Sequence, residues 1–253
     1  MSSSAPAGKP KLVFVHGAGS NRGFWHEQQA AFPEALFPNL PGHTDARGED
    51  AGAGRNSIEA YADWLEGWIE ERAITRVALN GHSMGGAIAL TLALRRPPWL
   101  QALVLTCTSA RLFVSPKLLG LLEDDYPSAV DFIVGHSFYV PPGGPTYASR
   151  ARLNGTRRQL LRIPQRVTLG DYAACSSFDV ADRLGEIGVP TLCIAGERDR
   201  MVPPGNGEQL RDGIAGCVLA LIENAGHMPP VEQPDAYNRT LVQFIQQKFG
   251  AGA

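Results

Sequence analysis

A serine stands in a glycine-rich stretch, GHSMG (81–85), between the apolar runs RVAL and AIALTLAL. The pattern GxSxG is typical of a serine at a sharp turn from a strand into a helix, where only small residues fit two positions to either side. In such a turn the hydroxyl of Ser83 projects above the carboxyl end of the strand, beside the free N–H groups of the helix start. The spacing therefore predicts a nucleophilic serine. The alternative is that glycine and serine merely form a turn.

A serine hydroxyl is a weak nucleophile at neutral pH, so it needs a general base and a group that orients the base. In chains with this turn, the acid and the histidine follow the serine in that order. Asp199 comes after the apolar run TLCIA and His227 after CVLALI, so each lies in a loop at the carboxyl end of a predicted strand. We predict that Asp199 orients His227, the base, with Glu197 as the fallback acid. The alternatives are a turn-capping carboxylate and a histidine bonded to backbone.

The segment VHGAGS (15–20) ends the first predicted strand with a glycine-rich turn. The backbone N–H groups of Ala18 and Met84 are predicted to form an oxyanion hole, which leaves His16 a structural role. The turn does not match a dinucleotide-binding loop, because GAGSNRG is GxGxxxG and no acidic residue ends the following strand. The chain also lacks the GK followed by Ser or Thr of a phosphate-binding loop.

Short apolar runs alternate with helical patterns along the chain. The runs are continuous, as in strands that are buried on both faces of a parallel sheet. They are KLVFV (11–15), ALF (35–37), RVAL (76–79), ALVLT (102–106), TLCIA (191–195) and CVLALI (217–222). Helices are predicted over 57–71, with Ser57 as N-cap, and over 234–249, with Pro at the start. This alternation predicts an α/β fold with a mostly parallel sheet of about six strands flanked by helices.

The stretch 111–188 interrupts the alternation. It contains apolar helical patterns but no convincing strand, and YVPPGGP (139–145) predicts a turn between two halves. We predict an α/β core formed by 1–110 and 189–253, with a helical cap, 111–188, inserted after the strand at 102–106. Its apolar side chains are candidates for the pocket, although each is more often packing: Phe113, Leu118, Leu119, Leu122, Phe132, Ile133, Phe138 and Tyr139.

The second half of this cap is rich in arginine. Six arginines precede its first acid, Asp171, and they are Arg150, Arg152, Arg157, Arg158, Arg162 and Arg166. The main interpretation is a solvated face that pairs with acids of the first half, because charge runs usually lie on the surface. The alternative is a pocket rim that attracts anions.

Composition limits the class of protein. At 253 residues, with 44% hydrophobic residues, the chain can bury one large core. Its net charge of -2 gives no basic field for nucleic acid. The four cysteines form no CxxC pair and the histidines lack metal-ligand spacing, so we expect no metal and no other cofactor. No signal core and no apolar run of about 18 residues is present, so we expect a cytoplasmic protein without a membrane partner. The oligomeric state stays open.

Five motifs together resemble those of the α/β-hydrolase superfamily. They are HGAG (16–19), LPGH (40–43), GHSMGG (81–86), GERD (196–199) and AGHMPPVEQP (225–234). The resemblance covers nearly the whole chain outside 111–188, and it implies Ser83 as nucleophile, Asp199 as acid and His227 as base. Two departures stand out: Asn39 and Thr44 replace a frequent acid and glycine, and only ten residues precede KLVFV, too few for the usual leading hairpin. We therefore expect a sheet without those two strands.

The motifs predict a serine hydrolase, carboxylesterase-like, that cleaves carboxylic esters of small to medium acyl chains. Its partner would be a small-molecule ester. A serine nucleophile argues against dehalogenase or epoxide-hydrolase chemistry, but it does not separate esterases from thioesterases, lactonases or perhydrolases. One alternative is a carbon–carbon bond or lactone hydrolase whose acidic substrate uses the cap arginines. An alternative of another class is a non-catalytic ligand receptor with the same fold.

Overall fold

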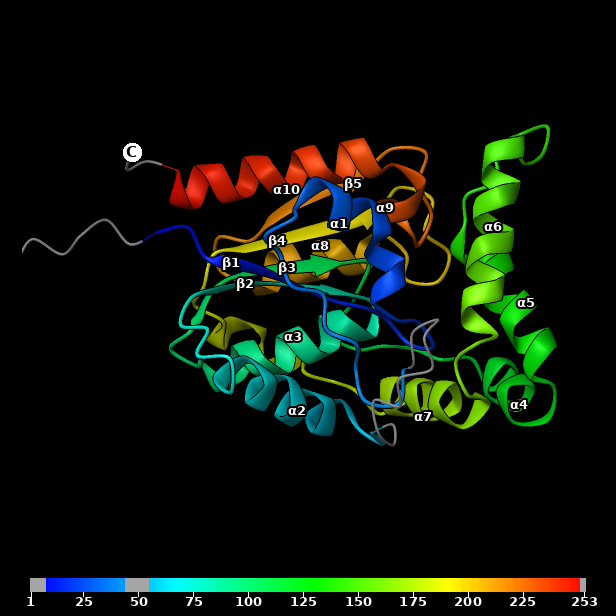
Figure 1. Ribbon diagram of the computed structural model, residues 1–253, viewed down its shortest axis with the longest axis horizontal. Helices are drawn as coiled ribbons and strands as arrows, with labels where there is room; N and C mark the ends of the chain where they lie inside the picture. The colour runs from blue at the N-terminus through cyan, green and yellow to red at the C-terminus, as the bar shows by residue number, and fades with distance from the viewer. Residues whose placement is uncertain (1–7, 44–54, 251–253) are drawn as a thin grey trace, which may run out of the picture.

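The computed structural model describes residues 8–43 and 55–250, and a parallel sheet of five strands forms its centre. In their order across the sheet, the strands are β1 (Lys11–Val15), β2 (Val77–His82), β3 (Leu100–Thr106), β4 (Thr191–Gly196) and β5 (Val218–Ile222) (Figure 1). Five of the six apolar runs thus form strands, as expected where helices cover both faces of a sheet. Among the described residues, β1 is the first strand.

The sixth run, ALF (35–37), does not form a strand, so the expectation of about six strands was one too many. It makes a single parallel bridge to β1, in which the Phe14 N–H donates to the Leu36 carbonyl at 2.8 Å and the Leu36 N–H donates to the Leu12 carbonyl at 2.9 Å. The next donor on this side would be the N–H of residue 38. Pro38 has none, so the pairing stops after one bridge.

This bridge occupies the edge of β1 that faces away from β2. After β1 the chain passes through α1 (His26–Ala31) to the bridge on the outer edge of β1. It then returns through α2 (Ile58–Glu70) to β2, which pairs with the opposite edge of β1. The loops that follow two strands at such a reversal diverge and leave a crevice at the carboxyl ends of the strands. Ser83 and the segment 16–20 follow the two strands that border this crevice.

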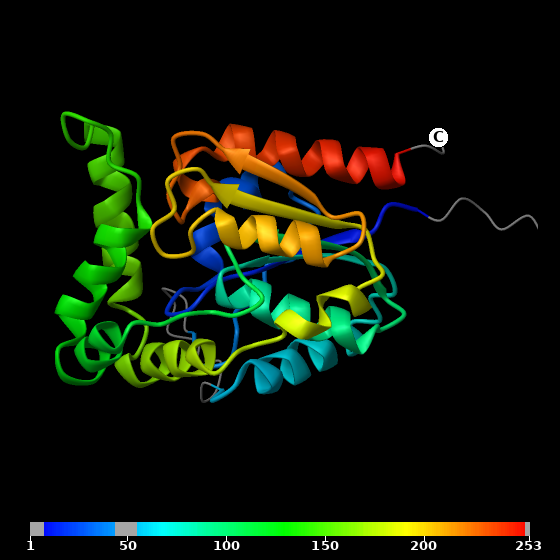
Figure 2. The ribbon, with the colours of Figure 1, turned by 180° about the vertical axis from the view of Figure 1, so that it is seen from behind.

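Helices form a layer on each face of the sheet (Figures 1 and 2). Those not yet given are η1 (Arg22–Trp25), α3 (Met84–Arg95), α4 (Pro116–Asp124), α5 (Tyr126–Ser137), α6 (Tyr147–Leu160), α7 (Gln165–Ser176), η2 (Ala181–Glu186), α8 (Gly205–Gly213), α9 (Pro229–Glu232) and α10 (Pro234–Phe249). α1 and α10 pack together on one face, whereas α2 and η2 both contact α3 on the other. The predicted helix at 234–249 matches α10, and Ser57 caps α2 by accepting the Ala60 N–H at 3.1 Å.

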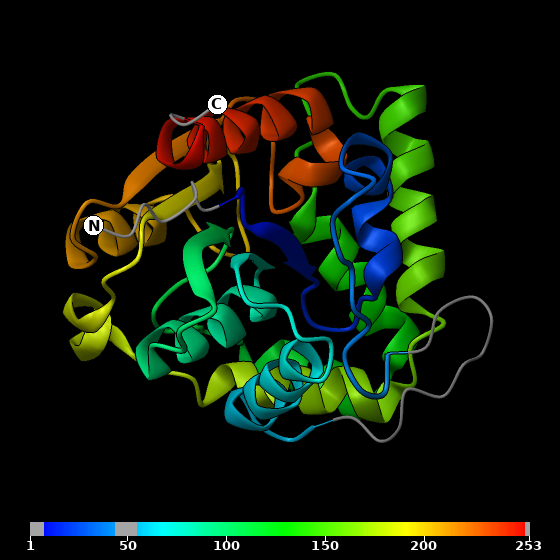
Figure 3. The ribbon, with the colours of Figure 1, turned by 60° about the vertical axis from the view of Figure 1, so that its left-hand side comes forward.

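The stretch 111–188 supplies α4, α5, α6, α7 and η2. α4, α5 and α6 stand together beyond the carboxyl ends of the strands, whereas α7 runs back toward α3 (Figures 1 and 3). The predicted turn at 139–145 lies between α5 and α6, with Gly143 and Gly144 at positive φ. Within this described stretch, the only strand pairing is an isolated bridge between Arg111 and Asp179.

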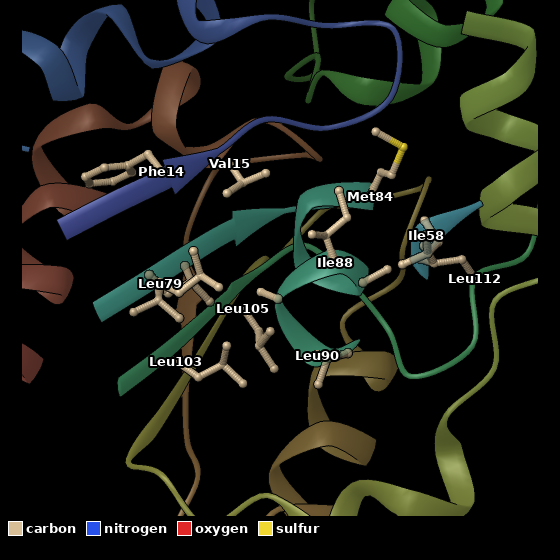
Figure 4. Close-up of a cluster of buried hydrophobic side chains, with 14 of the residues drawn as sticks. Phe14, Val15, Ile58, Leu79, Met84, Ile88, Leu90, Leu103, Leu105 and Leu112 are labelled. Carbon is tan, nitrogen blue, oxygen red and sulfur yellow. The ribbon is translucent and has the colours of Figure 1, made fainter. Parts of the chain in front are cut away.

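The central core lies between the sheet and α3 (Figure 4). Met84 and Ile88 of α3 are fully buried, as are Val15 and Leu79 of the strands. Nearly every residue of α3 is buried because the helix is enclosed by strands, α2, α7 and η2. The start of α3, and the serine before it, therefore rest on a rigid support.

Nothing in the two described ranges is a candidate membrane helix, since no helix there combines the length and the apolar character that a crossing needs. A cytoplasmic location stays a prediction.

Candidate active site

Ser83 occupies a sharp turn between β2 and α3. Its φ of 52° and ψ of -116° lie where residues with a side chain rarely occur. Hydrogen bonds hold this backbone, because the Ser83 N–H donates to the Thr106 carbonyl at 2.9 Å and the Thr108 hydroxyl donates to the Ser83 carbonyl at 2.8 Å. A Cβ at Gly81 would lie 2.1 Å from the carbonyl oxygen of Gly85, so the turn excludes side chains there, as the motif predicts.

Asp199 and His227 follow the adjacent strands β4 and β5 and meet above them. His227 Nδ1 lies 2.8 Å from Asp199 Oδ2, while the other Asp199 oxygen accepts the N–H groups of Met201 and Val202 at 2.8 and 2.9 Å. Burial acts to raise the pKa of Asp199, but His227 and these donors outweigh it, and the pKa lies below its ordinary value. Because the Asp199 carboxylate accepts a hydrogen bond, Nδ1 carries a proton, and in a neutral ring this leaves the lone pair on Nε2.

Glu197, the fallback acid, points elsewhere. It is exposed, and its carboxylate lies 3.5 Å both from the Asn224 N–H and from Arg198 Nη2. The structure therefore pairs His227 with Asp199.

Ser83 and His227 line one narrow cavity of about 30 Å³ at the crevice between β1 and β2. Its lining comes from the core and from the stretch 111–188 alike: Gly17, Ala18, Ser20, Phe24, His82, Ser83, Ile133, Ser137, Thr156, Gln159, Leu160, Tyr172, His227 and Met228. In the described part of the chain, the Ser83 hydroxyl has no hydrogen-bond partner, and neither the Ala18 nor the Met84 N–H is a donor. Catalytic hydrogen bonds are often long in a free enzyme.

Two further histidines lie in the loops around the cavity. His16 is buried and accepts the Leu40 N–H at 3.1 Å through Nε2, so it holds the segment 16–20 against Leu40. His82 Nε2 donates to the His227 carbonyl at 2.8 Å. Burial, together with nearby His227, lowers the pKa of His82 to about 3, so this ring is neutral. The sequence analysis did not single out His82 as a residue of the cavity, although its position directly before Ser83 points to this place.

A buried cluster around Asp171 of α7 was also missed. The Asp171 carboxylate accepts the Gly19 N–H at 2.8 Å, the Tyr61 hydroxyl at 2.6 Å and His43 Nε2 at 2.7 Å. His43 Nδ1 lies 3.0 Å from the Pro41 carbonyl, so both ring nitrogens face acceptors and both carry protons. Burial acts to lower the pKa of His43, but Asp171 outweighs it and raises the pKa. The ion pair attaches His43 to α7, and the Gly19 N–H bond attaches the segment 16–20 to the same carboxylate.

Of the two residues that depart from the family motif, Asn39 and Thr44, the structure describes only Asn39. Asn39 accepts the Arg22 N–H at 2.8 Å through Oδ1, so it supports the turn that starts η1. Thr44 lies outside the described residues.

The six arginines of the stretch 150–166 do not line the cavity. Arg157 forms an ion pair with Asp131 of α5, as the surface interpretation predicts, and Arg152 Nη1 donates to the Glu232 carbonyl at 3.3 Å. Of the apolar pocket candidates, Ile133 alone is part of the cavity lining, and Phe113 is 81% exposed. Helical spacing marks the apolar side of a helix, but it does not separate side chains that pack from those that border a cavity.

One group of side chains has the composition of a metal site. Cys107 presents its sulfur within 4.8 Å of ligand atoms of Asp199 and His227. Burial, followed by the charge of Asp199, raises the pKa of the Cys107 thiol well above its ordinary value. Cysteine binds a metal ion as the thiolate, and a raised pKa disfavours that form. These residues therefore fit an acid–histidine pair better than a metal centre.

Comparison with known proteins agrees with the fold. Residues 12–240 match the family model described as the alpha/beta hydrolase family. The chain therefore belongs to the alpha/beta hydrolase family, and the predicted superfamily and fold class are confirmed.

Relatives of this chain have several named activities. A pimeloyl-acyl-carrier-protein methyl ester esterase of Neisseria meningitidis is 30% identical over 96% of this chain and 79% of its own. A protein of Stutzerimonas stutzeri named as a carbamate hydrolase, RutD, is 29% identical over 95% and 93%. The solved structure of a thermophilic esterase has a TM-score of 0.80 and 30% identity over 94% of this chain and 90% of its own. The enol-lactonase of Burkholderia xenovorans is similar in fold, with a TM-score of 0.82 at 24% identity over 95% and 92%.

Proposed function

We propose that the protein is a serine hydrolase that cleaves carboxylic esters of small to medium acyl chains through an acyl-enzyme. One observation carries the proposal: Ser83, at a strained turn, shares a cavity with His227, whose Nδ1 is bonded to the buried Asp199 at 2.8 Å. A histidine oriented in this way offers Nε2 as a base toward the cavity. Esterases among the relatives support the same activity.

The reaction would proceed in two halves. His227 Nε2 takes the proton of the Ser83 hydroxyl as the oxygen attacks the ester carbonyl, and the N–H groups of Ala18 and Met84 stabilise the oxyanion. The imidazolium then protonates the leaving alcohol, which leaves an acyl group on Ser83. Water attacks this acyl-enzyme with His227 again as base, and the acid is released.

We further propose that 111–188 acts as a cap that selects the substrate, because this stretch contributes Ile133, Leu160 and Tyr172 to the cavity lining. Among the residues of 8–43 and 55–250 that line the cavity, none is Lys, Arg, Asp or Glu. A buried carboxylate would lack a cationic partner there, so a neutral acyl group is favoured over an acidic one. Carbamates present a neutral carbonyl too, and the RutD relative makes them the second candidate substrate.

The test is hydrolysis of p-nitrophenyl esters of graded acyl length, with carbamates and lactones alongside. Ser83→Ala lowers kcat on the order of 10⁶-fold without unfolding the chain. Ser176→Ala, at an exposed position of α7, is the matched control and keeps wild-type activity. Turnover that survives in Ser83→Ala contradicts the proposal, and a wild-type protein that binds these esters without turnover would be a receptor.

A further inference from the structure

Glu232, the last residue of α9, is a buried carboxylate in the loop that presents His227. It is 8% exposed, and its Oε1 accepts the N–H groups of Gly226 and Met228 at 2.8 and 3.0 Å. These two residues flank His227 in the chain. One oxygen atom therefore closes the turn 226–228 from the inside.

The second oxygen of Glu232 connects this turn to the cap. Oε2 accepts the Tyr139 N–H at 2.8 Å, and Tyr139 lies just after α5. The His227 N–H donates to the Ser137 carbonyl at 2.6 Å in the same place. The contact is so close that a Cβ at Gly226 would lie 2.6 Å from that carbonyl oxygen, so the turn and the segment 137–139 pack as one unit.

In the described part of the chain, no cation pairs with this carboxylate. Three residues near the Glu232 carboxylate have charged or titratable side chains. His227 lies in the same loop, and Tyr139 contacts the carboxylate through its backbone N–H. Arg152 of α6 instead donates to the backbone carbonyl of Glu232, at 3.3 Å. Burial raises the pKa of Glu232 to about 7, although the three N–H donors and His227 oppose it. The group therefore titrates near neutral pH.

We propose that Glu232 is a positioning residue of this active site: its carboxylate holds the turn that presents His227 and joins that turn to the segment after α5. The inference rests on the function proposed above. An ionised carboxylate can accept hydrogen bonds from all three N–H groups. A protonated carboxyl group carries an O–H of its own, and this hydrogen would face one of the N–H donors in place of an accepting lone pair. Protonation of Glu232 therefore loosens the turn, and the alignment of His227 depends on the same group that seats the cap.

The test compares Glu232→Gln, a nearly isosteric and permanently neutral variant, with the wild type over about pH 5 to 9, a range that includes the titration of Glu232. We expect kcat of Glu232→Gln to fall about 10- to 100-fold at high pH, because small misplacements of a catalytic group have effects of this size. On the acid side of a plot of log kcat against pH, the slope should correspond to the uptake of two protons in the wild type and of one proton in the variant. Amides 226, 228 and 139 should exchange hydrogen faster in the variant.

Glu223→Gln is the matched control, since it makes the same change at an exposed position of the same loop and keeps wild-type kcat. Wild-type kcat in a folded Glu232→Gln, or a one-proton acid limb in the wild type, overturns the inference. The second measurement needs no variant, so it decides the question even if Glu232→Gln does not fold. Failure of the proposed function is a separate result, because it appears as activity that survives in Ser83→Ala.

Discussion

Asp199–His227 and Asp171–His43 are two Asp–His pairs of almost equal length in very different surroundings. The nitrogen–oxygen distances are 2.8 and 2.7 Å, and both carboxylates are buried. His227 lines the cavity beside Ser83. His43 is enclosed, and its second ring nitrogen faces the Pro41 carbonyl at 3.0 Å. What differs is the neighbour of the second nitrogen.

That neighbour decides the chemistry of each ring. With acceptors on both sides, His43 is held as a cation and has no lone pair with which to take a proton. His227 has one acceptor, Asp199, beside Nδ1, and the ring lines the cavity. When the ring is neutral with its proton on Nδ1, Nε2 has a free lone pair. The first pair suits an ion pair between α7 and His43, at the end of the segment 40–43, and the second suits a base. An Asp–His distance alone does not identify a catalytic pair.

The largest expected effect is on catalysis at Asp199. Asp199→Asn should lower kcat about 10⁴-fold, because an amide favours the wrong tautomer of His227 and removes its lone pair from the cavity. Steady-state kinetics with a p-nitrophenyl ester measure this, and Glu197→Gln is the matched control with near wild-type kcat. If Asp171→Asn lowered kcat as much as Asp199→Asn, the distinction between the two pairs would fail.

The second effect is on stability at Asp171. Asp171→Asn removes one partner of a buried ion pair, so the free energy of unfolding should fall by about 3–5 kcal/mol. Urea denaturation followed by circular dichroism measures the change. The control is Asp179→Asn, which breaks the exposed pair with Arg111 and should hardly move the unfolding midpoint. Equal effects of the two substitutions would show that the His43 pair is not a buried ion pair in solution.

The smallest effect is the pH dependence of stability. The pKa of His43 is raised above 6.5 in the folded state, so its contribution is complete below that pH and is lost as pH rises through the folded pKa. The pKa of Asp199 is lowered below 3.8, so its contribution is lost only as pH falls through that lower value. A tenfold difference in proton affinity between the folded and unfolded chain changes the free energy of unfolding by about 1.4 kcal/mol.

Urea denaturation at a series of pH values checks this prediction. Wild-type stability should decline above pH 6.5 by an amount that His43→Gln abolishes, and the variant should be less stable at pH 6. A decline of the same size in the variant would assign it to another group.

Much of the fold could be predicted because its signals are local. Five apolar runs form strands within a few residues of the predicted bounds, and Ser57 caps α2 through a bond to a residue three positions away. The run 35–37 was wrongly predicted to be a strand, because its apolar residues were weighed without Pro38. The division into core and cap stays a prediction. η2, at the end of 111–188, packs with α3 and α8 of the core.

The candidate site was predictable in part. Ser83, Asp199 and His227 each stand at the end of a strand, and carboxyl ends of parallel strands meet at one edge of a sheet. Their catalytic roles stay predictions, and so do those of the Ala18 and Met84 N–H groups. Of the supporting groups, Glu232 lies inside the motif AGHMPPVEQP, but its three N–H partners could not be known without coordinates.

The sequence by itself determined the turn around Ser83, the five strands of the sheet and the family, since each of these depends on short segments of the chain. Only the tertiary structure decided which histidine is a cation and which has a free lone pair, and which side chains border the cavity. Asp171 and His43 are separated by 128 positions, and Glu232 and Tyr139 by 93. Protonation follows from the acceptors and the burial that such distant contacts create, and no local pattern encodes them.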